Sequence, residues 1–186
     1  MAKYLDIPQL TELISIRNQL FEHRCNAWLS SGIDLFENDT LSSLSLYEII
    51  SVYDPSFNIN FSRNGEDAIS NDVIIENKCS TVKPSKKGII PNTSFQFHAM
   101  GDLSYPRYVL AVRNKDDLSI ERLYDIKETH NTQLIQDHLH NERNRWLEKC
   151  NGTPKKYDVI TLKEGLLKCL SPVDIMHINN CTVVIG

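Results

Sequence analysis

An acidic pair followed by a lysine is the feature of this sequence with the most evident chemistry. Asp67 precedes Glu76 by nine residues, and Lys78 lies two residues beyond Glu76. An unbroken Val-Ile-Ile run leads into Glu76 and predicts a buried strand, on which residues two apart point to the same face. Glu76 and Lys78 therefore share a strand face, and Asp67 at the preceding turn is placed to complete the cluster.

Such a cluster suits a magnesium-dependent phosphodiesterase. Mg²⁺ prefers hard oxygen ligands and keeps several of its waters, so the candidate ligands are Asp67, Glu76 and the backbone carbonyl of Asn77. Lys78 would position the attacking water or help to deprotonate it. Asp67, Glu76 and Lys78 are accordingly the predicted catalytic residues, and Mg²⁺ is the predicted cofactor.

The chain contains a second set of residues with similar spacing. Asp117 precedes Asp125 by eight residues, and Lys127 follows two residues later. Glu76 ranks above Asp125 because charges are rarely placed at the end of a strand buried on both faces, whereas the polar residues that precede Asp125 alternate as on a surface strand. For any such acid and lysine, the alternative is charge pairing on a solvated face.

Helices are expected first and a sheet afterwards. Apolar residues at helical spacing predict helices over 6–30, 40–52 and 129–149. Period-two runs and turn signals predict strands over 57–61, 72–78, 107–113, 119–126, 157–162 and 182–185, with a helical turn within 161–169. Residues 80–102 predict a long loop with a short strand near its end. This order indicates one mixed α/β domain over residues 1–186.

The composition excludes several classes of protein. The chain has 186 residues, 41% of them hydrophobic, and five widely spaced cysteines without a Cys-x-x-Cys pair. A collagen, a coiled coil, a disulfide framework and a zinc site are therefore not expected. No apolar run approaches the roughly 20 residues that cross a bilayer, and the start lacks a signal-peptide core. We expect a cytoplasmic protein with no membrane partner.

Charge is unevenly distributed along the chain. Residues 1–60 hold three basic residues against eight acidic ones, while residues 83–115 hold six basic residues against one acidic residue. The second stretch predicts a face for nucleic acid. Within it, Lys83, Lys86 and Lys87 lie in a loop that is well placed to contact phosphates. The alternative is that these three lysines only keep the loop soluble. Gln96 carries an amide that can bond adenine through two hydrogen bonds.

The triplet of Asp67, Glu76 and Lys78 resembles the signature of the PD-(D/E)XK nuclease superfamily, and its surroundings are similar to a type II restriction endonuclease over most of the chain. The stretches that carry the resemblance are 32–37, 65–69 with Glu76 and Lys78, the strand pair 108–112 and 120–124, and Glu142, Arg143 and Trp146 leading to 156–159. The resemblance implies a restriction-endonuclease-like core with a mixed central β-sheet flanked by helices. Its parts would be a helical dimerisation region at 1–55, the catalytic sheet at 56–130, and a helix with DNA-recognition strands at 131–186.

The resemblance also implies an activity. It predicts a homodimer in a bacterial or archaeal cell that cleaves both strands of a short palindromic site in double-stranded DNA and leaves 5′-phosphate ends. Asn38 would lie near the minor groove, and Asn151 would lie near a base. Ser94 and His98 would stand with Gln96 where such enzymes read bases. The alternatives are a repair or junction-resolving nuclease of the same superfamily, or a DNA-binding module without activity.

Overall fold

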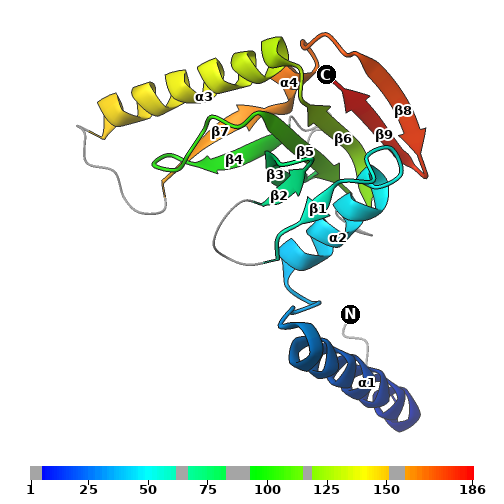
Figure 1. The fold of residues 1–186 in the computed structure, drawn as a ribbon. Helices are drawn as coiled ribbons and strands as arrows, with labels where there is room; N and C mark the ends of the chain where they lie inside the picture. The colour runs from blue at the N-terminus through cyan, green and yellow to red at the C-terminus, as the bar shows by residue number, and fades with distance from the viewer. Residues whose placement is uncertain (1–5, 62–66, 83–92, 115–118, 151–157) are drawn as a thin grey trace. The chain divides into compact units, whose positions relative to one another are not determined.

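The structure is a computed structural model, and it describes residues 6–61, 67–82, 93–114, 119–150 and 158–186 (Figure 1). The chain divides into two compact units, Met1–Leu44 and Ser45–Gly186. Helix α1 (Ile7–Ser31) belongs to the first unit, and the division falls within helix α2 (Asn38–Ile50). All elements after α2 belong to the second unit.

Helix α1 follows from strong local signals at both of its ends. The Asp6 carboxylate accepts a hydrogen bond from the backbone N–H of Gln9, whose side chain accepts one from the Asp6 N–H. This reciprocal capping box starts the helix, and Gly32, with φ of 69°, ends it in the left-handed conformation. None of its residues is buried. The large apolar residues exposed on it are Ile7, Leu10, Leu13, Ile14, Ile16, Leu20, Phe21, Trp28 and Leu29.

The second unit is built on a mixed seven-stranded sheet. Its strands are β1 (Asn58–Ile59), β2 (Ala68–Ser70), β3 (Val73–Thr81), β5 (Arg107–Arg113), β6 (Ile120–Ile126), β8 (Asp174–Ile178) and β9 (Cys181–Ile185). They lie in the order β1-β2-β3-β5-β6-β9-β8, with β3 parallel to β5 and β6 parallel to β9 (Figure 1). The predicted α/β class with a mixed central sheet is confirmed, and β2 and β8 are strands that the sequence does not predict.

Two hydrophobic clusters sandwich this sheet. The last residues of α2 pack with one face of β5, through Val109 and Ala111. Helix α3 (Thr129–Lys149) packs with the other face, through Tyr108 and Leu110, together with the short helix α4 (Glu164–Leu167). Strand β5 is buried from Arg107 to Val112, as its apolar run predicts. In the described part of the chain, no helix is both long and apolar enough to cross a membrane.

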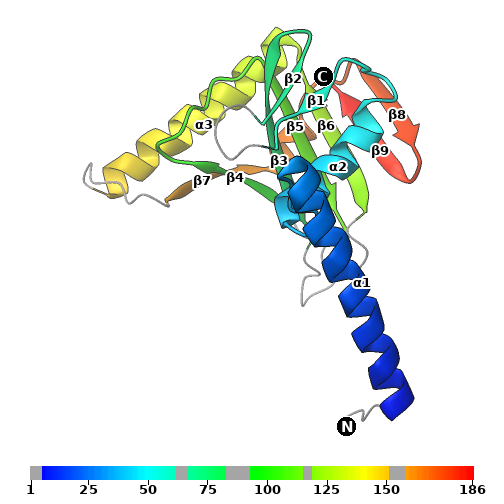
Figure 2. The same cartoon turned by 60° about the horizontal axis from the view of Figure 1, so that its bottom comes forward.

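A separate two-stranded antiparallel ribbon lies on the α3 side of the sheet. It consists of β4 (Ser94–His98) and β7 (Val159–Lys163), and α3 runs alongside it in both views (Figures 1 and 2). Strand β4 confirms the short strand expected near the end of the loop 80–102, and α4 confirms the helical turn within 161–169. On β4, the ribbon directs the polar side chains of Gln96 and His98 away from the core, and these two residues are among those predicted to contact DNA.

Candidate active site

A tight hairpin brings Asp67 beside Glu76. Strands β2 and β3 are joined by Asn71 and Asp72, whose φ values of 47° and 64° are both positive, as a type I′ turn requires. The register pairs the residue after Asp67 with the residue before Glu76. The two acids therefore meet because a two-residue turn sets the register of the hairpin.

Three oxygen atoms surround the ammonium of Lys78. Its Nζ lies 2.5 Å from Oε1 of Glu76, 3.2 Å from Oδ2 of Asp67 and 3.0 Å from the backbone oxygen of Asn77. The backbone N–H of Asn77 donates to the same Asp67 carboxylate at 3.0 Å and so fixes its position. The ring of Phe97 on β4 lies on another side, 5.8 Å from Nζ to the ring centroid. The structure thus brings together every residue predicted for the catalytic cluster.

Lys78 is a cation in this arrangement. Burial by itself would lower the pKa of Lys78, but the carboxylates of Glu76 and Asp67 outweigh burial and raise that pKa. Burial raises the pKa of Glu76, against the opposing charge and hydrogen bond of Lys78. A protonated amine cannot accept a proton, so in this state Lys78 acts by charge and by hydrogen-bond donation.

The same oxygens have the chemistry of a magnesium site. Two carboxylates and one carbonyl converge on a single cationic centre, and Mg²⁺ is commonly held by one or two carboxylates while water and substrate phosphate complete its octahedron. Among the described residues there is no group of three or more His, Cys, Asp or Glu side chains that could hold a metal. Asp67, Glu76 and the carbonyl of Asn77 nevertheless fit the predicted ion.

Tyr105 joins this cluster, and the sequence analysis does not predict it. Its hydroxyl forms a hydrogen bond with the carboxylate of Glu76. Burial first, and then the negative charge of Glu76, raises the pKa of Tyr105, so the phenol keeps its proton. The position of Tyr105 follows from strand pairing, because β3 and β5 are parallel and Glu76 lies opposite Tyr108. Residues just before β5 are thereby brought to Glu76.

Helix α3 holds the segment that carries Tyr105. The side-chain amide of Gln136 donates to the carbonyl of Tyr105 at 2.9 Å, and Nε2 of His140 lies 3.1 Å from Oγ of Ser104. The guanidinium of Arg143 donates to the backbone carbonyl at position 101. Positions 136, 140 and 143 lie on one side of a helix, so they form a row of contacts along this segment.

The structure describes some of the predicted DNA-contacting residues. Ser94, Gln96 and His98 lie on the same side of β4, with Gln96 and His98 exposed. Asn38 begins α2, but its side chain lies outside the described part. Lys83, Lys86, Lys87 and Asn151 also lie outside the described residues.

The ranking of Glu76 above Asp125 by strand burial is wrong in both of its parts. Val73 and Ile74, at the start of β3, are exposed, so the Val-Ile-Ile run is not buried on both faces. The interpretation of Asp125 as a surface residue is wrong too. Its side chain is fully buried and accepts two hydrogen bonds from Arg107, both at 2.7 Å, and one from the hydroxyl of Tyr53 at 3.0 Å. Lys127 lies exposed beyond the end of β6, and Asp117 lies outside the described residues. The polar alternation along β6 misleads because Arg107 and Tyr53, from distant parts of the chain, neutralise and satisfy the buried carboxylate.

Arg107 also connects the sheet to the turn after α2. Its Nη1 donates to Asp54 at 2.6 Å, and Asp54 accepts further hydrogen bonds from Ser56 and Ser70. Burial opposes ionisation of Asp54, but the hydrogen bonds from Ser56, Arg107 and Ser70 outweigh burial and lower its pKa to about 2. Arg107 is one of the six basic residues counted in 83–115. Because its guanidinium is buried and paired, it adds no charge to a DNA-binding face.

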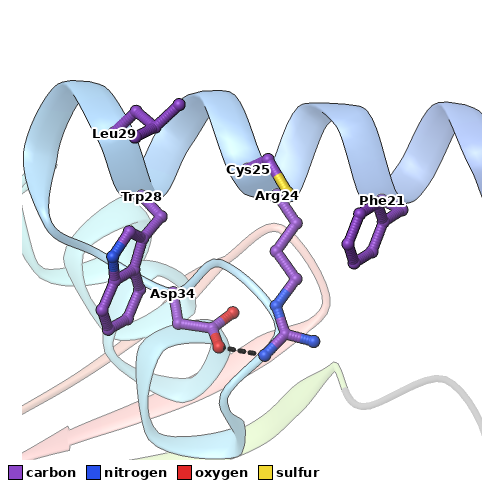
Figure 3. Close-up of a pocket in the computed structure, with 6 residues that line it drawn as sticks. All are labelled: Phe21, Arg24, Cys25, Trp28, Leu29 and Asp34. Carbon is purple, nitrogen blue, oxygen red and sulfur yellow. Dashed lines mark hydrogen bonds and ion pairs between the residues drawn. The ribbon is translucent and has the colours of Figure 1, made fainter.

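The first unit contains an apolar pocket of about 430 Å³. Its lining residues are Phe21, Arg24, Cys25, Trp28, Leu29 and Asp34 (Figure 3). Arg24 reaches across to form an ion pair with Asp34, and this hydrogen bond lowers the pKa of Asp34. The remaining side chains of the lining offer apolar contact, so this pocket suits binding better than catalysis.

Neither a protein-family model nor a curated protein matches the chain. Function is therefore inferred from the site itself.

Proposed function

We propose that the chain is a magnesium-dependent type II restriction endonuclease of the PD-(D/E)XK superfamily. The observation that supports this most is the convergence of Asp67, Glu76 and the Asn77 carbonyl on one cationic centre, the ammonium of Lys78, within strand β3. The restriction-endonuclease-like core and the dimerisation role of the helical region belong to the same proposal.

The residues divide the work of phosphodiester hydrolysis among themselves. Mg²⁺, when bound, lowers the pKa of a water molecule and stabilises the charge on the phosphate. Asp67, Glu76 and the Asn77 carbonyl would hold the ion, and Tyr105 fixes the Glu76 carboxylate by its hydrogen bond. Lys78 holds the attacking water or the phosphate by charge and hydrogen bonding. The water oxygen bonds to phosphorus as the bond to the 3′ oxygen breaks, which leaves a 5′-phosphate and a 3′-hydroxyl.

The DNA partner is proposed from charge and from the outward side of β4. Gln96 and His98 are exposed on that side with Ser94, and Phe97, between them in sequence, contacts the catalytic lysine from the opposite side of the strand. Strand β4 therefore has its outward polar residues on one side and the ring that contacts Lys78 on the other. Lys83, Lys86 and Lys87 are assigned to phosphates, and Asn38 and Asn151 to the grooves.

A homodimer is proposed because each chain has one catalytic cluster. Cutting both strands of a palindrome requires two clusters related by a two-fold axis. The exposed apolar side of α1 supports a partner there, since Phe21, Trp28 and Leu29 are 64, 55 and 82% exposed and line the apolar pocket (Figure 3). Sedimentation at micromolar concentration tests this. A protein that stays monomeric yet makes double-strand breaks in one encounter would contradict it.

The test of the function is a digest of phage DNA with purified protein and Mg²⁺. Discrete bands with 5′-phosphate ends support a restriction endonuclease. A smear, or cleavage confined to branched or damaged substrates, would indicate a repair or junction-resolving nuclease. DNA that stays intact but is bound would indicate a module without activity, in which Lys78 only neutralises the two acids. Asp67→Asn is the matched control for contaminating nuclease.

A further inference from the structure

The β4–β7 ribbon has one face in the core and one face outside it. Its buried side chains are Phe95, Phe97, Ile160 and Leu162. The alternate positions point away from the core, and the register places them in opposite pairs: Ser94 with Lys163, Gln96 with Thr161, and His98 with Val159. We call these six residues the outer ribbon face. Only its β4 half is recognised from the sequence.

The pairing of Gln96 with Thr161 has a specific chemistry. The two residues are 65 positions apart in sequence, but directly opposite residues of an antiparallel pair project to one side with Cβ atoms about 4.5–5.5 Å apart. A glutamine amide can bond N6 and N7 of adenine, and a threonine methyl can pack on the methyl of thymine. An amide beside a methyl therefore matches the major-groove edge of an A·T pair.

Lys163 brings positive charge to the end of the same face. It is exposed and lies opposite Ser94. The neighbouring acid, Glu164, does not cancel this charge, because Glu164 is buried and its carboxylate is bound by Arg122 at 2.7 Å and by the Tyr124 hydroxyl at 2.8 Å. A lysine at the edge of a surface that reads bases is well placed for a phosphate.

We infer that Gln96 and Thr161 together read an A·T base pair in the major groove, while Lys163 contacts a phosphate beside it. The major groove admits a two-stranded β-ribbon, and only there does thymine expose its methyl group. This inference rests on the proposed function, since it takes double-stranded DNA as the partner. It adds a specificity-determining residue on β7 and the identity of one base pair in the site.

The experiment uses the full chain in Ca²⁺ and begins by selecting bound duplexes from a random pool. In the selected site, the A·T pair is then replaced by G·C, or its thymine by uracil, which lacks only the methyl group. Wild-type protein should bind the uracil duplex about fourfold more weakly, as the loss of one buried methyl predicts. Thr161→Ser should no longer distinguish thymine from uracil, whereas Thr161→Val, which keeps a methyl group, should still do so. Gln96→Leu should reduce the preference for A·T over G·C by roughly tenfold or more.

Matched variants control for folding and for general charge. Thr182→Ser changes another half-buried strand threonine, on β9, and it should leave the thymine preference as in the wild type. Lys163→Ala should lower the slope of log affinity against log salt by about one unit on cognate and random duplexes alike. Lys127→Ala, at an exposed lysine beyond β6, should not change this slope. Thermal unfolding of each variant shows that the fold is intact.

The outcomes separate this inference from the proposed function. If the wild type selects a sequence and cuts it but Thr161→Ser still distinguishes thymine from uracil, the role of Thr161 is wrong and the nuclease proposal stands. A selected site without an A·T pair also overturns the inference. If Lys163→Ala leaves the salt slope unchanged, the proposed contact between Lys163 and a phosphate is wrong. If the wild type selects no sequence and cuts no duplex, the proposed function itself fails.

Discussion

Replacing Lys78 with methionine removes the cation that two carboxylates share. Lys78 and Glu76 keep only 26 and 11% of their side chains exposed, and removing one partner of a buried pair costs about 3–5 kcal/mol. Asp67 is 39% exposed, so solvent screens its part of the interaction. We therefore expect Lys78→Met to lose about 2–3 kcal/mol of unfolding free energy without divalent metal, or roughly 4–12 °C in Tm.

Divalent metal should then stabilise the variant more than the wild type. In the wild type, the Lys78 ammonium is bonded to the same oxygens of Asp67, Glu76 and Asn77 that would hold the ion. The variant presents these oxygens without a competing cation. Ca²⁺ at a hundred times its Kd adds about 2.7 kcal/mol to the stability of the form that binds it, which would offset most of the loss.

Urea unfolding followed by circular dichroism, in EDTA and in saturating Ca²⁺, measures both effects. The matched control is Lys127→Met, at an exposed lysine beyond β6, which should change neither the stability nor the response to Ca²⁺. If Ca²⁺ stabilises the wild type as much as Lys78→Met, the ammonium and the metal do not compete for these oxygens. The assignment of the metal ligands would then be wrong.

The catalytic role of the cluster predicts that Asp67→Asn abolishes Mg²⁺-dependent cleavage of duplex DNA, while Lys127→Ala cuts the same plasmid at near the wild-type rate. Tyr105→Phe should slow single-turnover cleavage about tenfold, because a hydrogen bond to a charged group is worth about 1.5–3 kcal/mol. Gln136→Leu should slow cleavage too, since the Gln136 amide holds the backbone carbonyl of Tyr105. Gln133→Leu, on the exposed side of α3, should not slow it. If all three variants cleave at equal rates, Tyr105 has no part in the mechanism. Asp54 has a pKa of about 2, below its ordinary value of 3.8, so the stability that its ionised form contributes is present above pH 3.8 and is lost as the pH falls toward 2. Urea unfolding should show the wild type and Asp54→Asn differing by about 2 kcal/mol at neutral pH and converging over that window; a constant difference would contradict the ion pair with Arg107.

Local patterns in the sequence were sufficient to predict most of the elements. Strand β5 and helix α3 have the predicted bounds, because an apolar run of strand length and a 3.6-residue period are each contained within one segment. Helix α1 is likewise predicted by the capping residues at its two ends. Strand β8 was not predicted, because its neighbouring apolar residues Ile175 and Met176 interrupt a strict alternation, although Met176 and Ile178 pack against the core.

The cluster was predictable in part: strand alternation placed Glu76 beside Lys78, but strand β2 and its turn at Asn71 and Asp72 were not predicted. A two-residue turn converts the separation of Asp67 from Glu76 into proximity, and strand alternation places Lys78 on the same side. Tyr105 is near Glu76 only because β3 pairs with β5 in parallel. No pattern within either strand specifies that pairing.

Tertiary structure also decided the meaning of individual charges. Asp125 has the sequence context of a surface residue, yet it forms a buried ion pair with Arg107 between β5 and β6. Thr161 has no distinguishing context on β7 until the register sets it opposite Gln96. Sequence periodicity determines which side of an element faces the core. The partner across that side comes from the register between distant strands, which depends on the packing of the whole unit and not on any local run of residues.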